Sequence, residues 1–233
     1  MTSVPTRVSS AGDASAERVT AFLRVVYAWM FVGLGITAAV AAAIMSTPAF
    51  EQMVASNRVL FVGALVAELG VVFYLSARVQ KLTPNAATIL FLLYAILNGV
   101  TLSVLTLTYS GSSIATAFAV TAGMFGVLAI FGSTTKRSLA GTGQFFYMGL
   151  IGLVLASLLR LFWHNDALEF LISVIGVFVF TGLTAWDAQR LKRMAAGPQA
   201  VDGSYAIMGA LSLYLNFINL FLFMLRFQSG RRA

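Results

Sequence analysis

The long uncharged stretches of this chain constrain its fold more than any other feature. Residues 82–135 contain no Asp, Glu, Lys or Arg. A helix that crosses a bilayer needs about 20 apolar residues, so this stretch is too long for one such helix. The polar turn at residues 109–113 (Tyr-Ser-Gly-Ser-Ser) divides it into two. Over all 233 residues, 59% are apolar and only 10% are charged, which excludes a soluble enzyme, a disordered chain and a coiled coil.

Seven stretches of this kind follow one another along the chain. They are continuously apolar rather than alternating, which favours helices over the strands of a membrane barrel. We therefore predict an all-α, polytopic membrane protein with a flexible polar N-terminal tail at residues 1–19, a transmembrane domain at residues 20–228 and a C-terminal tail at residues 229–233. A topology of six spans and one re-entrant segment is the alternative. The seven predicted spans are residues 25–50, 59–77, 86–108, 113–133, 144–163, 168–189 and 205–227.

Lys and Arg gather on one side of this topology. Cytoplasmic loops carry an excess of both residues, so the loops on the N-terminal side place the N-terminus in the cytoplasm. Arg226, Arg231 and Arg232 oppose this orientation, because they leave positive charge at an outer C-terminus. The net charge of +7 is expected to face anionic lipid rather than nucleic acid. The basic residues on the predicted inner side are Arg7, Arg18, Arg24, Arg78, Lys81, Lys136, Arg137, Arg190, Lys192 and Arg193, and those near the outer loops are Arg58 and Arg160.

The residue types present argue against catalysis. The chain has no cysteine, and its single histidine, His164, cannot form a zinc centre alone. An intramembrane serine protease needs a base beside its nucleophile, but His164 lies in a predicted outer turn. An intramembrane aspartyl protease needs two carboxylates that share a proton, and Asp187 has no second membrane aspartate. We expect no enzymatic activity and no cofactor.

An acid near the cytoplasmic end of the sixth predicted span is the first candidate site. Ionisable side chains inside a span are costly and mark function by default. Asp187 lies there, and Arg190 follows three residues later. One interpretation is a local ion pair on the surface of a helix end. The other is a carboxylate at a cytoplasmic pore mouth that attracts or gates cations.

A polar stripe on the last predicted span is the second candidate. Ser212, Asn216 and Asn219 follow the i, i+4, i+7 spacing of one helix face, and Arg226 continues that face outward. On an otherwise apolar helix this face must point into the bundle. The two amides either line a site or hold helices together by hydrogen bonds, and the two roles are compatible. Ala206, Gly209 and Ala210 favour close helix contact at the inner end.

Three further polar residues complete the candidates. Glu68, midway along the second predicted span, should be protonated, hydrogen-bonded or paired with a cation, and Arg226 is the candidate partner. Arg78, at the inner end of the same span, has the right depth to meet Asp187. Asn98 is expected to form an interhelical hydrogen bond.

Several segments together resemble the transmembrane Bax inhibitor motif family, also called the Bax inhibitor-1 family, and specifically its bacterial inner-membrane members. The resemblance covers nearly the whole chain after the tail, and its last two motifs are the most specific. The segments are VYAWMFVGL at 26–34, TAGMFG at 121–126 with STTKR at 133–137, FTGLTAWDAQRLK at 180–192 and GALSLYLNFINLFLFMLR at 209–226.

The resemblance implies a seven-helix fold whose seventh helix is central and wrapped by two layers of three. It also implies a pH-sensitive calcium leak, with calcium as the transported ion. In this family a pair of aspartates on helices six and seven senses protons, and an arginine on helix two meets the first of them. Asp187 matches that first aspartate, and Arg78 matches the arginine. Glu68 and Arg226 match an outer acid and arginine, which we call the outer latch.

One position departs from the family pattern. Where the motif reads Leu-Asp-Phe-Ile-Asn, this chain has Asn216 in place of the second aspartate. Two close carboxylates titrate as a unit, and an aspartate beside an asparagine does not. The amide can donate permanently to Asp187, which favours the ionised carboxylate, and one negative charge is lost from any cation site. We predict an altered pH response.

Two functions remain in competition. The first is a cation leak channel in which Asp187 offers calcium a weak site, since calcium prefers six to eight oxygen ligands. The second is a non-conducting regulator in the inner membrane that binds a membrane protease or a stress-response partner. Ser212, Asn219 and Asn98 support the polar interior in the first case.

Overall fold

The computed structural model describes residues 11–78, 81–160, 165–197 and 203–230, and these residues contain helices and turns but no strand. The all-helical prediction is confirmed for them. His164 and the Arg residues at positions 7, 231 and 232 lie outside the described residues. The elements are α1 (Ala11–Met45), α2 (Pro48–Ser56), α3 (Arg58–Arg78), α4 (Pro84–Ser103), the 3₁₀ turn η2 (Val104–Leu107), α5 (Gly111–Thr134), α6 (Ala140–Arg160), α7 (Asp166–Ala195) and α8 (Gly203–Gly230).

The seven long helices follow the predicted spans in order, with two differences. Helix α1 has 35 residues and begins at Ala11, so it takes in residues that the sequence assigned to the tail. A separate nine-residue helix, α2, follows α1, because Pro48 starts a new helix at its first turn. The predicted sixth and seventh spans are therefore α7 and α8.

Polar residues mark the starts of three helices. The side chain of Thr83 accepts a hydrogen bond from the backbone of Ala86, with Pro84 in the first turn of α4. Ser110 caps α5 through Ser113. Asn165 caps α7 by accepting from the backbone of Ala167 and Leu168. Such caps satisfy amide groups that have no partner within the helix, so the polar turns between the apolar stretches define where helices begin.

Six helices in the described part of the chain are long and apolar enough to cross a membrane. Helix α3 has 21 residues, as many as α6, but is not one of the six, so the count of seven spans stays a prediction. Large apolar side chains such as Phe31, Phe73 and Met148 are mostly exposed on the outside of the bundle. Patches of this kind on a helical bundle suit a lipid environment. The six helices are α1, α4 with η2, α5, α6, α7 and α8.

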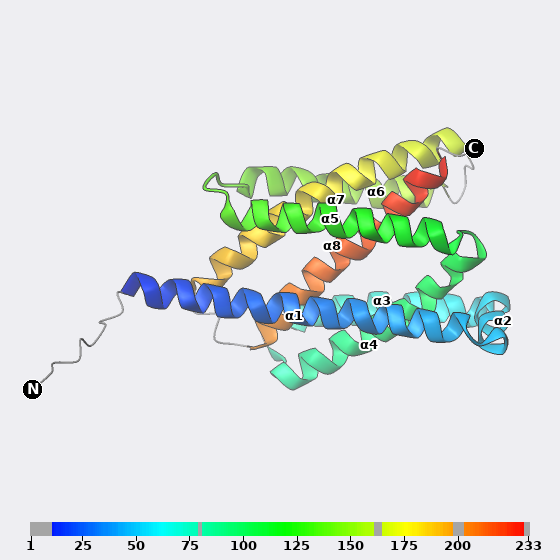
Figure 1. Cartoon of the computed structure of the whole chain (residues 1–233), viewed down its shortest axis with the longest axis horizontal. Helices are drawn as coiled ribbons and strands as arrows, with labels where there is room; N and C mark the ends of the chain where they lie inside the picture. The colour runs from blue at the N-terminus through cyan, green and yellow to red at the C-terminus, as the bar shows by residue number, and fades with distance from the viewer. Residues whose placement is uncertain (1–10, 79–80, 161–164, 198–202, 231–233) are drawn as a thin grey trace, which may run out of the picture.

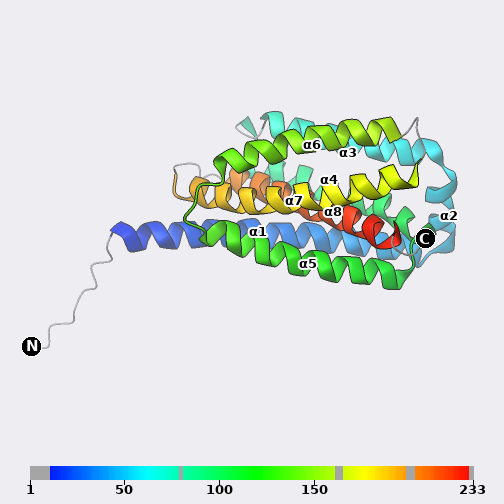
Figure 2. The ribbon, with the colours of Figure 1, turned by 90° about the horizontal axis from the view of Figure 1, so that it is seen from above.

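Helix α8 occupies the middle of the bundle. It packs against α1, α4, α5 and α7, while α3 packs against α4 and α6 against α7. In Figure 1, α8 runs obliquely from below α1, near the start of α4, past α5 to the end of the bundle where α7 begins. Figure 2 shows the same helices from above, with the N-terminal end of α1 and the C-terminal end of α8 at opposite ends. In the most apolar 18-residue stretch of α8, 72% is buried, whereas the corresponding stretches of the other five candidate membrane helices are 39% buried or less.

Small residues allow the closest helix approaches. Gly209 faces Leu191 of α7 and Val26 of α1, and its neighbours Ala206 and Ala210 are buried. The predicted close contact at the inner end of α8 is therefore present. On α5, Gly132 lies against the backbone carbonyl of Ala185, so that an added Cβ would overlap that oxygen. This contact sets the spacing between α5 and α7, two residues before Asp187.

Candidate functional site

Asp187 is a buried carboxylate at the contact of α7 with α8. It is 5% exposed. Ser212 Oγ donates to Asp187 Oδ2 at 2.6 Å, and Asn216 Nδ2 donates to the same oxygen at 2.7 Å. Arg190 Nη1 lies 3.4 Å from Asp187 Oδ1. All three neighbours are donors, which suits an ionised carboxylate because that group only accepts. We call these four residues the Asp187 site.

The helix periodicity of α8 explains how two donors reach one oxygen. Ser212 and Asn216 are four residues apart and so lie one turn apart on the same face. This face meets α7 at Asp187, and the two bonds tie the helices together. The ion pair with Arg190 is present, but Asp187 is buried and bonded to a second helix. The interpretation as a local surface pair therefore does not describe the site by itself.

Arg190 lies at the rim of the site rather than inside it. Its side chain is 38% exposed, against 7% for the side chain of Asp187. Its guanidinium also lies 5.5 Å from the ring centre of Trp186. The aromatic ring attracts the partly hydrated guanidinium. Arg190 therefore supplies positive charge beside Asp187 near the end of α7.

The predicted pairing of Arg78 with Asp187 is not formed. Arg78 is exposed at the end of α3, and the donors to Asp187 among the described residues are Ser212, Asn216 and Arg190. The physical reason is that α3 packs against α2 and α4 rather than against α7. Equal depth in the membrane does not bring two helices into contact. The basic partner of Asp187 is Arg190, where the sequence had predicted Arg78.

The outer latch is also not formed. Thr101 Oγ1 donates to Glu68 Oε1 at 2.8 Å, so Glu68 of α3 finds its partner on α4. The guanidinium of Arg226 lies 5.7 Å from the ring centre of Phe223. Phe223 in turn stacks on Phe180 of α7. Arg226 therefore lies on the side of α8 that faces α7. Glu68, in contrast, lies on the side of α3 that faces α4.

Asn98 and Asn219 bond within their own helices. Asn98 Nδ2 donates to the hydroxyl of Tyr94 at 3.2 Å, and Asn219 Nδ2 donates to the carbonyl of Leu215 at 2.8 Å. The expected interhelical bond of Asn98 is thus replaced by one to a residue four positions earlier. Asn98 Oδ1 is buried with no partner. Of the predicted stripe on α8, only Ser212 and Asn216 reach Asp187.

Sequence reasoning missed a hydroxyl contact that joins three helices. Thr37 Oγ1 of α1 lies 2.6 Å from the hydroxyl of Tyr214 on α8 and donates to the carbonyl of Ala95 on α4. All three residues are buried. Hydroxyl groups within apolar helices often bond a backbone carbonyl, so they give little signal in a sequence. Only the position of Tyr214 between Ser212 and Asn216 could have drawn attention to it.

A second missed residue is Gln189, two positions after Asp187. Its Oε1 accepts from the backbone of Leu139 at 2.8 Å, and its Nε2 donates to the carbonyl of Arg137 at 2.7 Å. Gln189 is 6% exposed. The two bonds fasten the connection between α5 and α6 to α7. The signal available in the sequence was the amide of Gln189 so close to Asp187 in the segment at 180–192.

The oxygen groups of the Asp187 site can offer a calcium ion little coordination. The described residues hold no group of three His, Cys, Asp or Glu side chains that could bind a metal ion. Asp187 contributes a carboxylate, Ser212 a hydroxyl and Asn216 an amide oxygen if its side chain turns. Calcium prefers six to eight oxygen ligands, so most of its ligands here would be water. Such a set does not suit a tightly bound calcium ion.

The bond between Glu68 and Thr101 can be tested by replacing first one partner and then both. We expect Thr101→Val to lower the free energy of unfolding by about 1–3 kcal/mol, because a buried acid loses its donor. Thermal unfolding of the purified protein in detergent measures this. The double variant Thr101→Val/Glu68→Met should recover most of the loss, since both polar groups are then removed. A double variant less stable than the single one would contradict this pairing.

Comparison with known proteins places the chain in a family. The model of the family "Inhibitor of apoptosis-promoting Bax1" matches residues 19–233. The inner membrane protein YbhL of Escherichia coli K12 is 46% identical over 215 residues, which cover 91% of this chain and 92% of that protein. An uncharacterized protein of Deinococcus radiodurans is 42% identical over 219 residues, covering 92% and 93%. An uncharacterized membrane protein of Streptococcus pyogenes is 39% identical over 210 residues, covering 88% and 90%. The family match over nearly the whole length, together with the helical bundle and the motif that carries Asp187, shows that the chain belongs to the Bax inhibitor-1 family.

Proposed function

We propose that this protein is a pH-sensitive calcium leak channel of the bacterial inner membrane, with an altered proton sensor. The observation that carries the proposal is Asp187, a carboxylate buried between α7 and α8 near the basic end of the bundle. A buried ionisable group inside a membrane protein marks an ion or proton pathway by default. The name of the relative YbhL, an inner membrane protein, supports the location. The transported ion is what the family resemblance implies.

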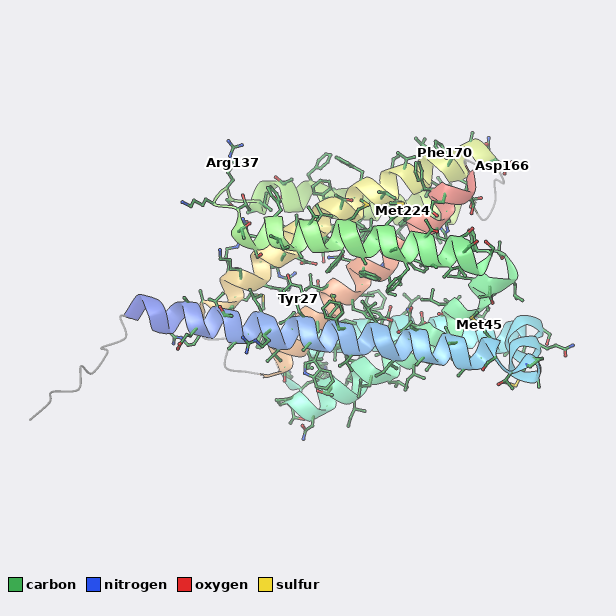
Figure 3. All side chains as sticks on the ribbon, viewed as in Figure 1. Tyr27, Met45, Arg137, Asp166, Phe170 and Met224 are labelled. Atoms are coloured by element: carbon green, nitrogen blue, oxygen red, sulfur yellow. The ribbon has the colours of Figure 1, made fainter. Side chains whose placement is uncertain are left out.

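In the proposed topology all seven long helices cross the membrane. Helix α8 is wrapped by α1, α3 and α4 on one side and by α5, α6 and α7 on the other. The N-terminus lies in the cytoplasm, because Lys136, Arg137, Lys192 and Arg193 line one pocket with Val19, which lies in the first part of α1. Figure 3 shows Arg137 at this end of the bundle and Asp166 with Phe170 at the other. The positive-inside rule then places the Asp187 site near the cytoplasmic surface.

The proposed gate is the set of bonds from α8 and Arg190 to Asp187. While Asp187 is ionised, the hydrogen bonds from Ser212 and Asn216 hold the inner parts of α7 and α8 together, and the ion pair with Arg190 within α7 stabilises the charge of the carboxylate. A proton on the carboxylate removes its charge and turns one acceptor oxygen into a donor. Arg190 then loses its partner, and the bonds from Ser212 and Asn216 weaken. We expect the inner ends of the two helices to separate more readily and the leak to increase as pH falls.

The function can be tested with the purified protein alone. The full chain is reconstituted into liposomes, and calcium entry is followed with an enclosed fluorescent indicator between about pH 5 and pH 8. Entry above that of protein-free liposomes supports the channel. No entry at any pH, with one membrane protein recovered in stoichiometric amount by cross-linking in cells, contradicts it and favours the regulator.

The role of Asp187 is tested by Asp187→Asn. The amide has nearly the same shape but no titratable proton, so the leak should lose its pH dependence. A gate coupled to one proton can change by up to about tenfold per pH unit, and this is the effect that should vanish. The flux assay described above is the measurement.

Asp166→Asn is the matched control for this variant. It makes the same change on the same helix, but at an exposed residue at the far end of α7. We expect it to keep the pH profile of the parent. If Asp187→Asn also keeps that profile, Asp187 is not the sensor.

A further inference from the structure

A basic pocket lies at the end of the bundle where α5 and α7 finish. It has a volume of about 350 Å³ and is lined by Lys136 and Arg137 from the α5–α6 connection and by Lys192 and Arg193 from α7. Val19 of α1 lies on its other side. Lys136, Arg137, Lys192 and Arg193 are all exposed to solvent. Arg137 points outward at this end in Figure 3.

The pocket is held in place by hydrogen bonds. Gln189 fastens the connection to α7 through the backbone of Leu139 and Arg137. Lys192 Nζ donates to the carbonyl of Ser133 at 2.6 Å, which joins α7 to the last turn of α5. These three bonds fix the backbone that carries the basic side chains. The pocket therefore does not depend on a loop that must first be ordered.

The charges of the pocket are unbalanced. Four cations line it, and no carboxylate is among its lining residues. Like charges at close range repel one another, and an anion that enters the pocket relieves that repulsion. Pockets of basic residues between membrane helices on the cytoplasmic side are typical sites for anionic lipid headgroups.

An apolar pocket borders the same connection. It measures about 190 Å³ and lies among α5, α6 and α7, with Leu139, Phe131 and Phe178 in its lining. Phe131 and Phe178 are largely exposed on the outer surface of the bundle. Leu139 lines this pocket, and the preceding residue, Ser138, lines the basic one. A positive pocket at the helix ends and an apolar pocket at membrane depth thus share one short segment.

We propose that these two pockets bind an anionic phospholipid, with its phosphate-bearing headgroup in the basic pocket and an acyl chain against the apolar one. A free phosphate would use the basic pocket alone and leave the apolar one without a role. A zwitterionic lipid would fill the apolar pocket but would bring no net negative charge. The combination of both surfaces favours a lipid that carries both properties. This inference concerns binding and does not depend on the proposed channel activity.

Native mass spectrometry of the purified full chain tests the proposal with phosphatidylglycerol as the probe. The variant Lys136→Gln/Arg193→Gln removes two pocket charges. We expect it to lower the affinity by about 30-fold, because each basic residue near an anionic lipid surface contributes roughly fivefold. The matched control is Arg24→Gln/Lys81→Gln, which removes two exposed charges outside the pocket lining. It should bind phosphatidylglycerol nearly as the parent does.

Three results would overturn the proposal. Equal losses in the two variants would mean that lipid is attracted by net charge and not by a site. Equal affinity of the parent for phosphatidylglycerol and phosphatidylcholine would remove the role of the basic pocket. Displacement of phosphatidylglycerol by millimolar inorganic phosphate would show that a free anion is the ligand.

Discussion

The Asn216→Asp variant should carry a calcium leak that rises at a distinctly higher pH than the leak of the parent protein. Asn216 Nδ2 lies 2.7 Å from Asp187 Oδ2, so the variant places two carboxylates within hydrogen-bond distance. Two such groups cannot both ionise without strong repulsion, and they take up and release protons as a unit. The parent has a single carboxylate that is held by donors, without this coupling.

The expected change is large because proton uptake acts directly on the α7–α8 contact. We expect the half-maximal leak of the variant to lie about one pH unit or more above that of the parent, because the first proton on the pair relieves the repulsion between the two carboxylates. Calcium entry into liposomes between about pH 5 and pH 8 measures this midpoint. The double variant Asn216→Asp/Asp187→Asn restores a single carboxylate on the opposite helix. It should return the midpoint towards that of the parent.

Asn219→Asp provides the matched control on the same helix. Its amide bonds the carbonyl of Leu215 within α8 and does not reach Asp187. An added carboxylate there should leave the midpoint of the pH profile unchanged. If Asn219→Asp shifts the midpoint as much as Asn216→Asp, the effect comes from negative charge on α8 in general. The coupling between positions 187 and 216 would then be wrong.

The second large effect is expected from Gly132→Ala. A Cβ at this position would overlap the backbone carbonyl of Ala185, and a backbone atom cannot move aside without shifting the whole helix. Overpacking of this kind costs about 1–3 kcal/mol. We expect the variant to unfold at a temperature several degrees lower than the parent, as followed by thermal unfolding in detergent.

Gly123→Ala on the same helix is the control. An added Cβ there would meet no atom within 4 Å. Because alanine favours the helix over glycine, this variant should be as stable as the parent or more stable. Opposite effects of the two substitutions would show that the α5–α7 contact, and not helix propensity, requires Gly132. Equal effects would contradict the tight contact.

The helices and the centre of the site could be predicted from the sequence. Uninterrupted apolar stretches set the number and order of the long helices, and polar turns set their starts. Ser212 and Asn216 were predicted to share one face because helix periodicity is local. The sequence marked Asp187 as a candidate because it lies inside an apolar stretch, but left open whether it is buried or forms a surface ion pair with Arg190. Each of these inferences depends on neighbours along the chain.

The contacts between distant helices could not be predicted in the same way. Depth along the membrane can be estimated from the sequence, but the rotation of each helix and the choice of its neighbours cannot. Arg78 was expected at the depth of Asp187, yet α3 packs on α4. Glu68 has a hydroxyl on α4 within reach and takes Thr101 instead of Arg226. The amide of Asn98 likewise finds Tyr94 one turn away.

The last three turns of α7 hold the proposed proton sensor Asp187, the amide that anchors the α5–α6 connection and two cations of the basic pocket. Asp187 and Gln189 are separated by one residue, and Lys192 follows a turn later. A helix end moves as a rigid unit, so a lipid headgroup that binds or leaves the basic pocket would displace the same end of α7 as a proton on Asp187. Under these two proposals, membrane composition and cytoplasmic pH would act on one helix end.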